Sequence, residues 1–118
     1  FEELEAYRWL PYLKKGGTLI TSTQQIEPMP VITGAMEYPA DLVSKLAEAG
    51  ADITAVDALS LAEEAGTAKA SNVVLMGVLS AKTDFPEELW QNALEQCVPP
   101  KFLELNKKAF ELGRNAAK

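Results

Sequence analysis

The polar side chains best suited to binding something lie in the segment from Thr21 to Pro30, directly after a predicted strand. In open α/β sheets, ligands bind beyond the carboxyl ends of the strands. The hydroxyls and amides of this segment could hydrogen-bond a ligand. Met29 between two prolines could instead form a stiff apolar arm that docks on a partner, or the segment could be only a connection. The candidate residues here are Gln24, Gln25, Pro28, Met29, Pro30, Thr33 and Gly34.

Two asparagines later in the chain are further candidates for a partner contact or for the wall of an active site. Asn72 precedes an apolar run and could cap a helix there. Asn106 falls on an apolar helical face, where its amide must find a hydrogen-bond partner. That partner could be the backbone of the Pro99–Pro100 turn or a group across a subunit boundary. Gly113, on the same face, could allow a close helix approach or end the helix.

The residues that usually carry catalysis or hold metals are scarce. The chain has no histidine and a single cysteine, Cys97, so Ser–His and Cys–His nucleophile pairs cannot form within it. The same count leaves no zinc or iron–sulfur ligand set of the Cys/His kind. Carboxylate pairs such as Glu63–Glu64 are more typical of a solvated helix face. We therefore expect no catalytic residue and no metal in this chain, with Cys97 buried and inert.

Charge and hydropathy narrow the classes of partner. The formal charge is −6 and no Lys/Arg cluster exceeds a pair, which argues against nucleic acid and against anionic lipid. The longest apolar run, 73–79, is far too short to cross a bilayer. A lone cysteine cannot form an internal disulfide, which suits a cytoplasmic protein.

Hydrophobic spacing and turn residues predict two strands and five or six helices that must position these candidates. Strands are expected over 18–23 and 52–56. The segment 24–36 is expected to be a loop without helix, extended at 31–33, because prolines recur two apart. Helices are expected over 1–15 with a break near Pro11, from Pro39 to Gly50, over 58–65, from Pro86 to the prolines at 99 and 100, and from Lys101 onward. The run 73–79 is apolar on every side, so its spacing fits a strand or a helix.

The elements predict an α/β fold: a few-stranded sheet covered by helices, with a helix-rich C-terminal half. Two or three strands form a marginal sheet by themselves. We therefore expect residues 1–118 to be a single partial domain, a fragment of a larger three-layer α/β domain, that associates into an oligomer. The first residue, Phe1, agrees with a fragment, and a processed start is the alternative.

The amino-acid sequence of several segments resembles that of a known family, the small subunits of 2-oxoacid:ferredoxin oxidoreductases. The likeness is greatest to the C-terminal part of the beta-subunit type that serves indolepyruvate, a relative of the gamma subunit of the pyruvate enzyme. The segments that carry it are 23–34, 72–80, 85–90, 99–106 and 109–113. The glycine-rich turn of that family after its first strand is not in this sequence, so no phosphate or coenzyme contact of that turn is carried over.

The resemblance implies that 72–82 is a buried helix. It also implies a subunit or domain that ligates no cofactor and supports thiamine-dependent oxidative decarboxylation by a partner. Thiamine diphosphate and iron–sulfur clusters would belong to the large partner subunit, coenzyme A is a possible acceptor, and ferredoxin would be reached through the complex. The alternative is a non-catalytic α/β interaction module that scaffolds another complex.

Overall fold

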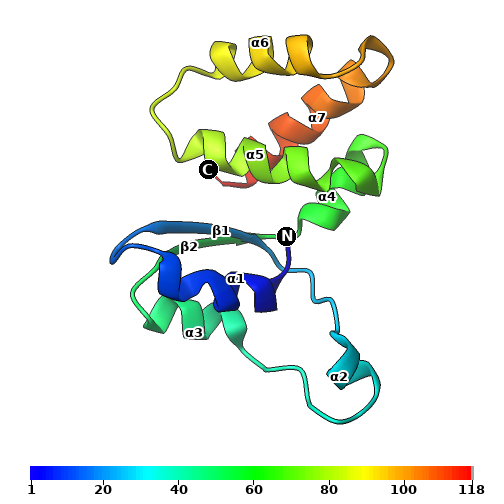
Figure 1. The fold of residues 1–118 in the computed structure, drawn as a ribbon. Helices are drawn as coiled ribbons and strands as arrows, with labels where there is room; N and C mark the ends of the chain where they lie inside the picture. Colours follow the sequence, from blue (N-terminus) through cyan, green and yellow to red (C-terminus); the bar gives the residue numbers. More distant parts are fainter. Residues whose placement is uncertain (118) are drawn as a thin grey trace. The chain divides into compact units, whose positions relative to one another are not determined.

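The chain divides into two compact units in a computed structural model that describes residues 1–117. The first unit is Phe1–Ala55 and the second begins at Val56. The first unit holds α1 (Glu3–Trp9), a 3-10 turn η1 (Leu10–Tyr12), β1 (Thr18–Ser22), α2 (Met29–Ile32), α3 (Leu42–Glu48) and β2 (Asp52–Val56), which runs to the boundary (Figure 1). The expectation that residues 1–118 form a single partial domain stays a prediction.

The first helix is split where the sequence predicts a break. α1 ends at Trp9 and continues as η1, in which Pro11 occupies an early position. Proline is tolerated there because the first turn of a helix has no partner for its N–H groups. At the other end, the Glu2 side chain caps α1 by accepting a hydrogen bond from the Glu5 N–H.

The two strands form a parallel sheet with α3 as the crossover between them. Two hydrogen bonds fix the register at the start of the strands. The Asp52 N–H donates to the Gly17 carbonyl at 3.0 Å, and the Thr18 hydroxyl donates to the Asp52 carboxylate at 3.3 Å. α1 and α3 lie on the same side of the strands (Figure 1). Leu42 and Leu46 of α3 are buried there and form the apolar core of this unit.

The expectation that 24–36 holds no helix is wrong. Met29–Ile32 forms the short helix α2, with Pro28 as its cap and Pro30 in its first turn. Proline forbids a helix interior, but in the first turn its missing N–H costs nothing. The N–H groups of Val31 and Ile32 both donate to the Pro28 carbonyl, so the segment expected to be extended is helical.

The expected start of the next helix at Pro39 is also wrong, since α3 begins at Leu42. Asp41 adopts a left-handed backbone conformation, with φ of 57°, and a right-handed helix cannot run through it. Pro39 therefore belongs to the connection that leads back from α2. The end of this helix before Gly50 is as predicted.

Apart from Val56, which ends β2, the regular elements among the described residues of the second unit are all helices. It contains α4 (Ala58–Ala65), a 3-10 turn η2 (Ala68–Ala70), α5 (Ser71–Ala81), α6 (Glu87–Cys97) and α7 (Pro100–Ala116). The all-apolar run 73–79 is helix, as predicted. Asn72 is not its cap, because η2 leads directly into α5 and the capping position falls on Ala70.

Close packing of α5 on α7 forms the core of this unit. A Cβ added at Gly77 would overlap the Phe110 carbonyl oxygen, and one added at Gly113 would lie 2.8 Å from the carbonyl carbon of Val74. The helices thus touch backbone to backbone at two reciprocal glycines. Of the two roles open to Gly113, the structure selects close approach, since α7 continues past it to Ala116.

The buried side chains around this crossing come from all the helices of the unit. Phe110, Val74, Val78 and Ala62 have no exposed surface, and Leu94 joins them from α6. Trp90 packs beside this core, with its ring centroid 6.0 Å from that of Phe110. The α/β fold with a helix-rich C-terminal half is therefore confirmed. Over the part of the chain that is described, no helix has the length and apolarity that crossing a membrane requires.

Candidate functional site

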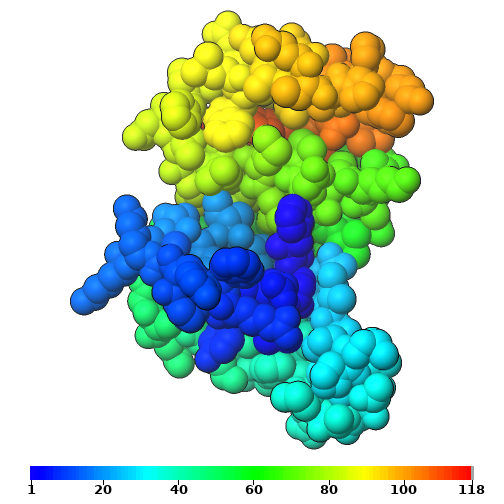
Figure 2. Space-filling model, in the orientation of Figure 1, coloured from blue at the N-terminus to red at the C-terminus, as the bar shows by residue number. Residues whose placement is uncertain are grey.

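Seven of the nine candidate residues lie in or beside a projecting segment of the first unit. We call residues 26–37, from Ile26 to Glu37, the arm. Figure 2 shows the cyan part of the chain around α2 as a knob that stands out from the rest of the unit. Its apolar side chains face solvent: Met29, Ile32 and Met36 are 66%, 61% and 65% exposed.

Local hydrogen bonds give the arm a defined shape. The Thr33 N–H donates to the Met29 carbonyl and its hydroxyl donates to the Pro30 carbonyl at 3.2 Å, which ends α2. Gly34 then turns the chain with φ of 83°, a value that other residues rarely adopt. The Met36 N–H donates back to the Pro30 carbonyl at 3.0 Å. Thr33 and Gly34 thus shape the arm.

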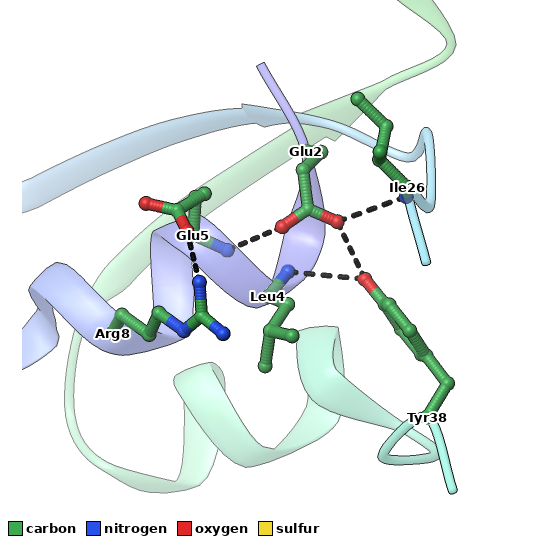
Figure 3. A network of polar contacts seen from close by, with 6 residues as sticks. All are labelled: Glu2, Leu4, Glu5, Arg8, Ile26 and Tyr38. Carbon is green, nitrogen blue, oxygen red and sulfur yellow. Dashed lines mark hydrogen bonds and ion pairs between the residues drawn. The ribbon is translucent and has the colours of Figure 1, made fainter. Parts of the chain in front are cut away.

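A polar network at the first turn of α1 holds both ends of the arm (Figure 3). The Glu2 carboxylate accepts hydrogen bonds from the Ile26 N–H at 3.1 Å, the Tyr38 hydroxyl at 2.6 Å and the Glu5 N–H at 2.5 Å. The Leu4 N–H donates to the Tyr38 hydroxyl oxygen at 3.2 Å. Ile26 begins the arm and Tyr38 directly follows its last residue, so one carboxylate closes its base. We call Glu2 and Tyr38 the clasp.

The clasp perturbs the titration of both its members. Burial raises the pKa of Glu2, but hydrogen bonds from Tyr38, Ile26 and Glu5 outweigh it, so the pKa falls below its ordinary value. Burial and the adjacent Glu2 carboxylate raise the pKa of Tyr38 to about 12. Both shifts favour the same state at neutral pH, a charged Glu2 and a neutral, donating Tyr38.

The two glutamines that precede the arm are tied to α1. The Gln24 carbonyl accepts from the Glu3 N–H at 3.1 Å, and the Gln25 amide donates to the Glu3 carboxylate at 2.9 Å. The Gln24 N–H donates to the Ser22 hydroxyl at 3.3 Å. These hydrogen bonds position the entry to the arm, and the Gln25 residue stays exposed beside the apolar tip.

Asn72 and Asn106, the other two candidates, lie together on the second unit. They line a hollow of about 520 Å³ between the end of α6, the start of α7 and the start of α5. The Asn106 amide donates to the Phe102 carbonyl at 2.9 Å. The bond to the Pro99–Pro100 turn, one of the two partners considered, is therefore wrong: α7 already begins at Pro100, and the amide donates to a carbonyl one turn back within the same helix.

The same hollow includes Cys97, which is exposed. The expectation of a buried thiol is wrong because α6 ends at Cys97 and its buried stripe stops at Leu94. The hollow is otherwise mostly apolar, with Lys69 as its basic side chain.

An iron–sulfur cluster, one of the cofactors that the resemblance implies, does not fit this chain. An iron–sulfur cluster needs several thiolates, and the sequence has one cysteine and no histidine. Among residues 1–117, no group of three or more His, Cys, Asp or Glu side chains is placed to hold a metal ion, such as the one that a diphosphate would need. No step of a reaction is therefore assigned to a cofactor on this chain.

Sequence reasoning missed Glu2 and Tyr38. Glu2 shows a weak local signal, an acidic residue three positions before the N–H that it caps. Its other contacts, to Ile26 and Tyr38, lie 24 and 36 residues away, and no spacing rule connects them.

Comparison with known proteins gives a consistent result. The family model for pyruvate ferredoxin/flavodoxin oxidoreductase matches residues 1–116. Among curated proteins, the chain is 44% identical to the indolepyruvate oxidoreductase subunit IorB of Thermococcus kodakarensis and 40% identical to that of Pyrococcus horikoshii, over the whole chain in both cases. It is 32% identical over 98% of its length to the protein of the same name from Archaeoglobus fulgidus.

The match covers only part of these relatives. The chain spans 61% of the length of the Thermococcus and Pyrococcus proteins. No solved structure matches the chain significantly.

Proposed function

Because the chain belongs to the pyruvate ferredoxin/flavodoxin oxidoreductase family, we propose that it forms part of a subunit of a 2-oxoacid oxidoreductase that acts on indolepyruvate or a similar acid. The observation that carries this proposal is the identity of 44% and 40%, over the whole chain, to two indolepyruvate oxidoreductase subunits. The reaction would remove carbon dioxide and electrons from the 2-oxoacid and pass the electrons to ferredoxin, in the cytoplasm.

The role proposed for this chain is structural support of a partner that does the chemistry. Thiamine diphosphate and iron–sulfur clusters would lie on the large partner subunit, with coenzyme A as a possible acyl acceptor. The single cysteine and the lack of histidine support that division of labour. The surfaces proposed to meet the partner are the arm with its flanking glutamines, and the hollow that contains Asn72 and Asn106.

The test is reconstitution with full-length proteins. We expect the full-length subunit, purified together with its large partner, to reduce ferredoxin or a viologen dye when indolepyruvate and thiamine diphosphate are present. The subunit alone should show no turnover and should carry no stoichiometric iron.

Two results would contradict the proposal. Turnover by the isolated subunit would show that it holds its own cofactors. An intact complex that is inactive with every 2-oxoacid tried, with its clusters and thiamine loaded, would favour the alternative of a non-catalytic interaction module.

A further inference from the structure

We propose that the arm is a preformed docking element that inserts Met29, Ile32 and Met36 into an apolar groove with a basic rim on the large partner subunit. We further propose that the clasp, Glu2 and Tyr38, positions it. The inference rests on the proposed function for the identity of the partner, and it adds the chemistry of the contact and the residues that prepare it.

The tip of the arm exposes several large apolar side chains close together. Single exposed apolar side chains are ordinary, but here three large ones lie within eight residues on one short helix and the turn after it. Ile26, at the base, is also 55% exposed. Val31 of α2 is half-buried and lines a small hollow with Leu4 of α1, and Met36 lines the same hollow while most of its surface stays exposed.

The charges around the tip specify the partner. Glu27 and Glu37 flank the apolar residues, the segment 24–38 contains no Lys or Arg, and neither glutamate forms an ion pair within residues 1–117. An anionic membrane or a nucleic acid would repel both carboxylates. A protein groove with Lys or Arg at its edges would attract them and steer the encounter.

The clasp lowers the conformational entropy that the arm loses when it docks. Both ends are bonded to one carboxylate, and Pro28 and Pro30 fix two of the backbone angles between them. A loop that is already closed and stiff loses little conformational freedom when it docks, so more of the burial energy appears as affinity. Glu2 and Tyr38 would therefore affect binding although neither lies at the tip.

The first experiment measures the affinity of full-length subunit variants for the purified partner. We expect Met29→Asp to weaken binding about 30-fold or more, because a carboxylate would have to enter an apolar groove. The conservative control, Met29→Leu, should bind within about threefold of the unchanged protein. Thermal melts of both variants should match it, since Met29 touches little of its own unit.

The second experiment is a double-mutant cycle that separates positioning from general stability. Tyr38→Phe should weaken binding about tenfold, because the arm must then be ordered on docking. Tyr12→Phe, the same change at an exposed tyrosine outside the arm, should have no effect. In the Met29→Asp background, Tyr38→Phe should weaken binding by less than about a further twofold. An arm that cannot dock gains no affinity from being held in its docking conformation.

The third experiment tests the basic rim. Glu27→Gln with Glu37→Gln should slow association about threefold to tenfold at low salt and much less at high salt. Glu48→Gln, at an exposed glutamate on α3, is the matched control and should leave the rate unchanged.

The outcomes distinguish this inference from the proposed function. Tight partner binding by Met29→Asp would overturn the docking arm and leave the proposed function intact. An equal loss from Tyr38→Phe in both backgrounds would overturn positioning by the clasp. If the unchanged subunit fails to bind the partner, the proposed function is contradicted, and so is the proposal that the arm docks on that partner.

Discussion

The two units of this chain are stabilised internally by different kinds of contact. In the second unit, α5 and α7 meet at Gly77 and Gly113, where the absence of side chains lets two backbones touch. In the first, the apolar core is essentially Leu42 and Leu46, and a charged carboxylate at Glu2 organises the segments around it. The comparison teaches that one unit depends on close packing and the other on a few polar groups.

This difference has a functional consequence. A close-packed crossing resists local opening, because any separation loses many contacts at once. A segment held at its base by hydrogen bonds can keep its shape while its outer face stays free. The first unit is therefore suited to present the arm, whereas the second is suited to resist local opening.

The largest effect is expected from filling the helix crossing. Gly77→Ala or Gly113→Ala should destabilise the second unit by about 3 kcal/mol or more, since the added methyl group meets backbone atoms that cannot rotate away. Elsewhere in a helix the same change would stabilise by about 1 kcal/mol. Urea unfolding of each variant measures the change. Asn115→Ala, on the exposed surface of α7, is the control, and an unaffected Gly113→Ala protein would refute the close approach.

A smaller loss is expected when the clasp is removed. Glu2→Ala leaves the Ile26 and Glu5 N–H groups and the Tyr38 hydroxyl without their acceptor, and should cost about 2–3 kcal/mol in the first unit. The matched control is Glu5→Ala, which removes an exposed ion pair with Arg8 and should cost less than about 0.5 kcal/mol. Equal losses from the two variants, measured by urea unfolding, would show that Glu2 has no special role.

A comparable test within the second unit concerns Ser80. Its buried hydroxyl donates to the Gly77 carbonyl at 2.6 Å and accepts from the Arg114 guanidinium at 3.0 Å. Ser80→Ala should destabilise the unit by about 1–2 kcal/mol, because Arg114 loses an acceptor. If the loss rivals that of the glycine variants, polar groups matter as much here as in the first unit and the contrast fails.

The smallest effect is expected from pH. The pKa of Glu2 is lowered from 4.5, so its contribution to stability is present above pH 4.5 and is lost as the pH falls through the lowered value. The pKa of Tyr38 is raised from 10.0 to about 12, so its contribution is present below pH 10 and is lost as the pH rises toward 12. Tyrosinate absorbance should show a transition near pH 12 that Tyr38→Phe lacks. Its persistence in that variant would argue against the clasp.

Sequence patterns predicted most elements for identifiable reasons. Both strands follow from residue types and lengths, and the break at Pro11 follows from the missing N–H. Residue types alone fit strand or helix over 73–79, and the family resemblance favours the helix that the structure shows. The helix at Met29–Ile32 was missed because proline was treated as a breaker where it stands in a first turn. The exposure of Cys97 was missed because it depends on where α6 ends, and helix ends are the least predictable part of a pattern.

Sequence patterns indicate the segment of the candidate site but not the contacts that shape it, and its role in binding stays a prediction. The run of polar, proline and methionine residues pointed to 24–34, and the structure shows there an exposed apolar tip. What holds that tip could not be predicted, because Glu2 and Tyr38 meet only through the fold. Asn72 and Asn106 were likewise chosen separately, and only packing of α5 and α7 places them around one hollow.

Hydrogen exchange of the full-length subunit, alone and bound to its large partner, tests the central claim most directly. The account predicts that the hydrogen-bonded amides of residues 26–37 already show some protection in the free subunit, because the arm is preformed, and become strongly protected in the complex. Amides at the α5–α7 crossing should already be slow and should not change. Unchanged exchange in the arm on complex formation, with new protection elsewhere, would contradict the claim that the arm is the docking element.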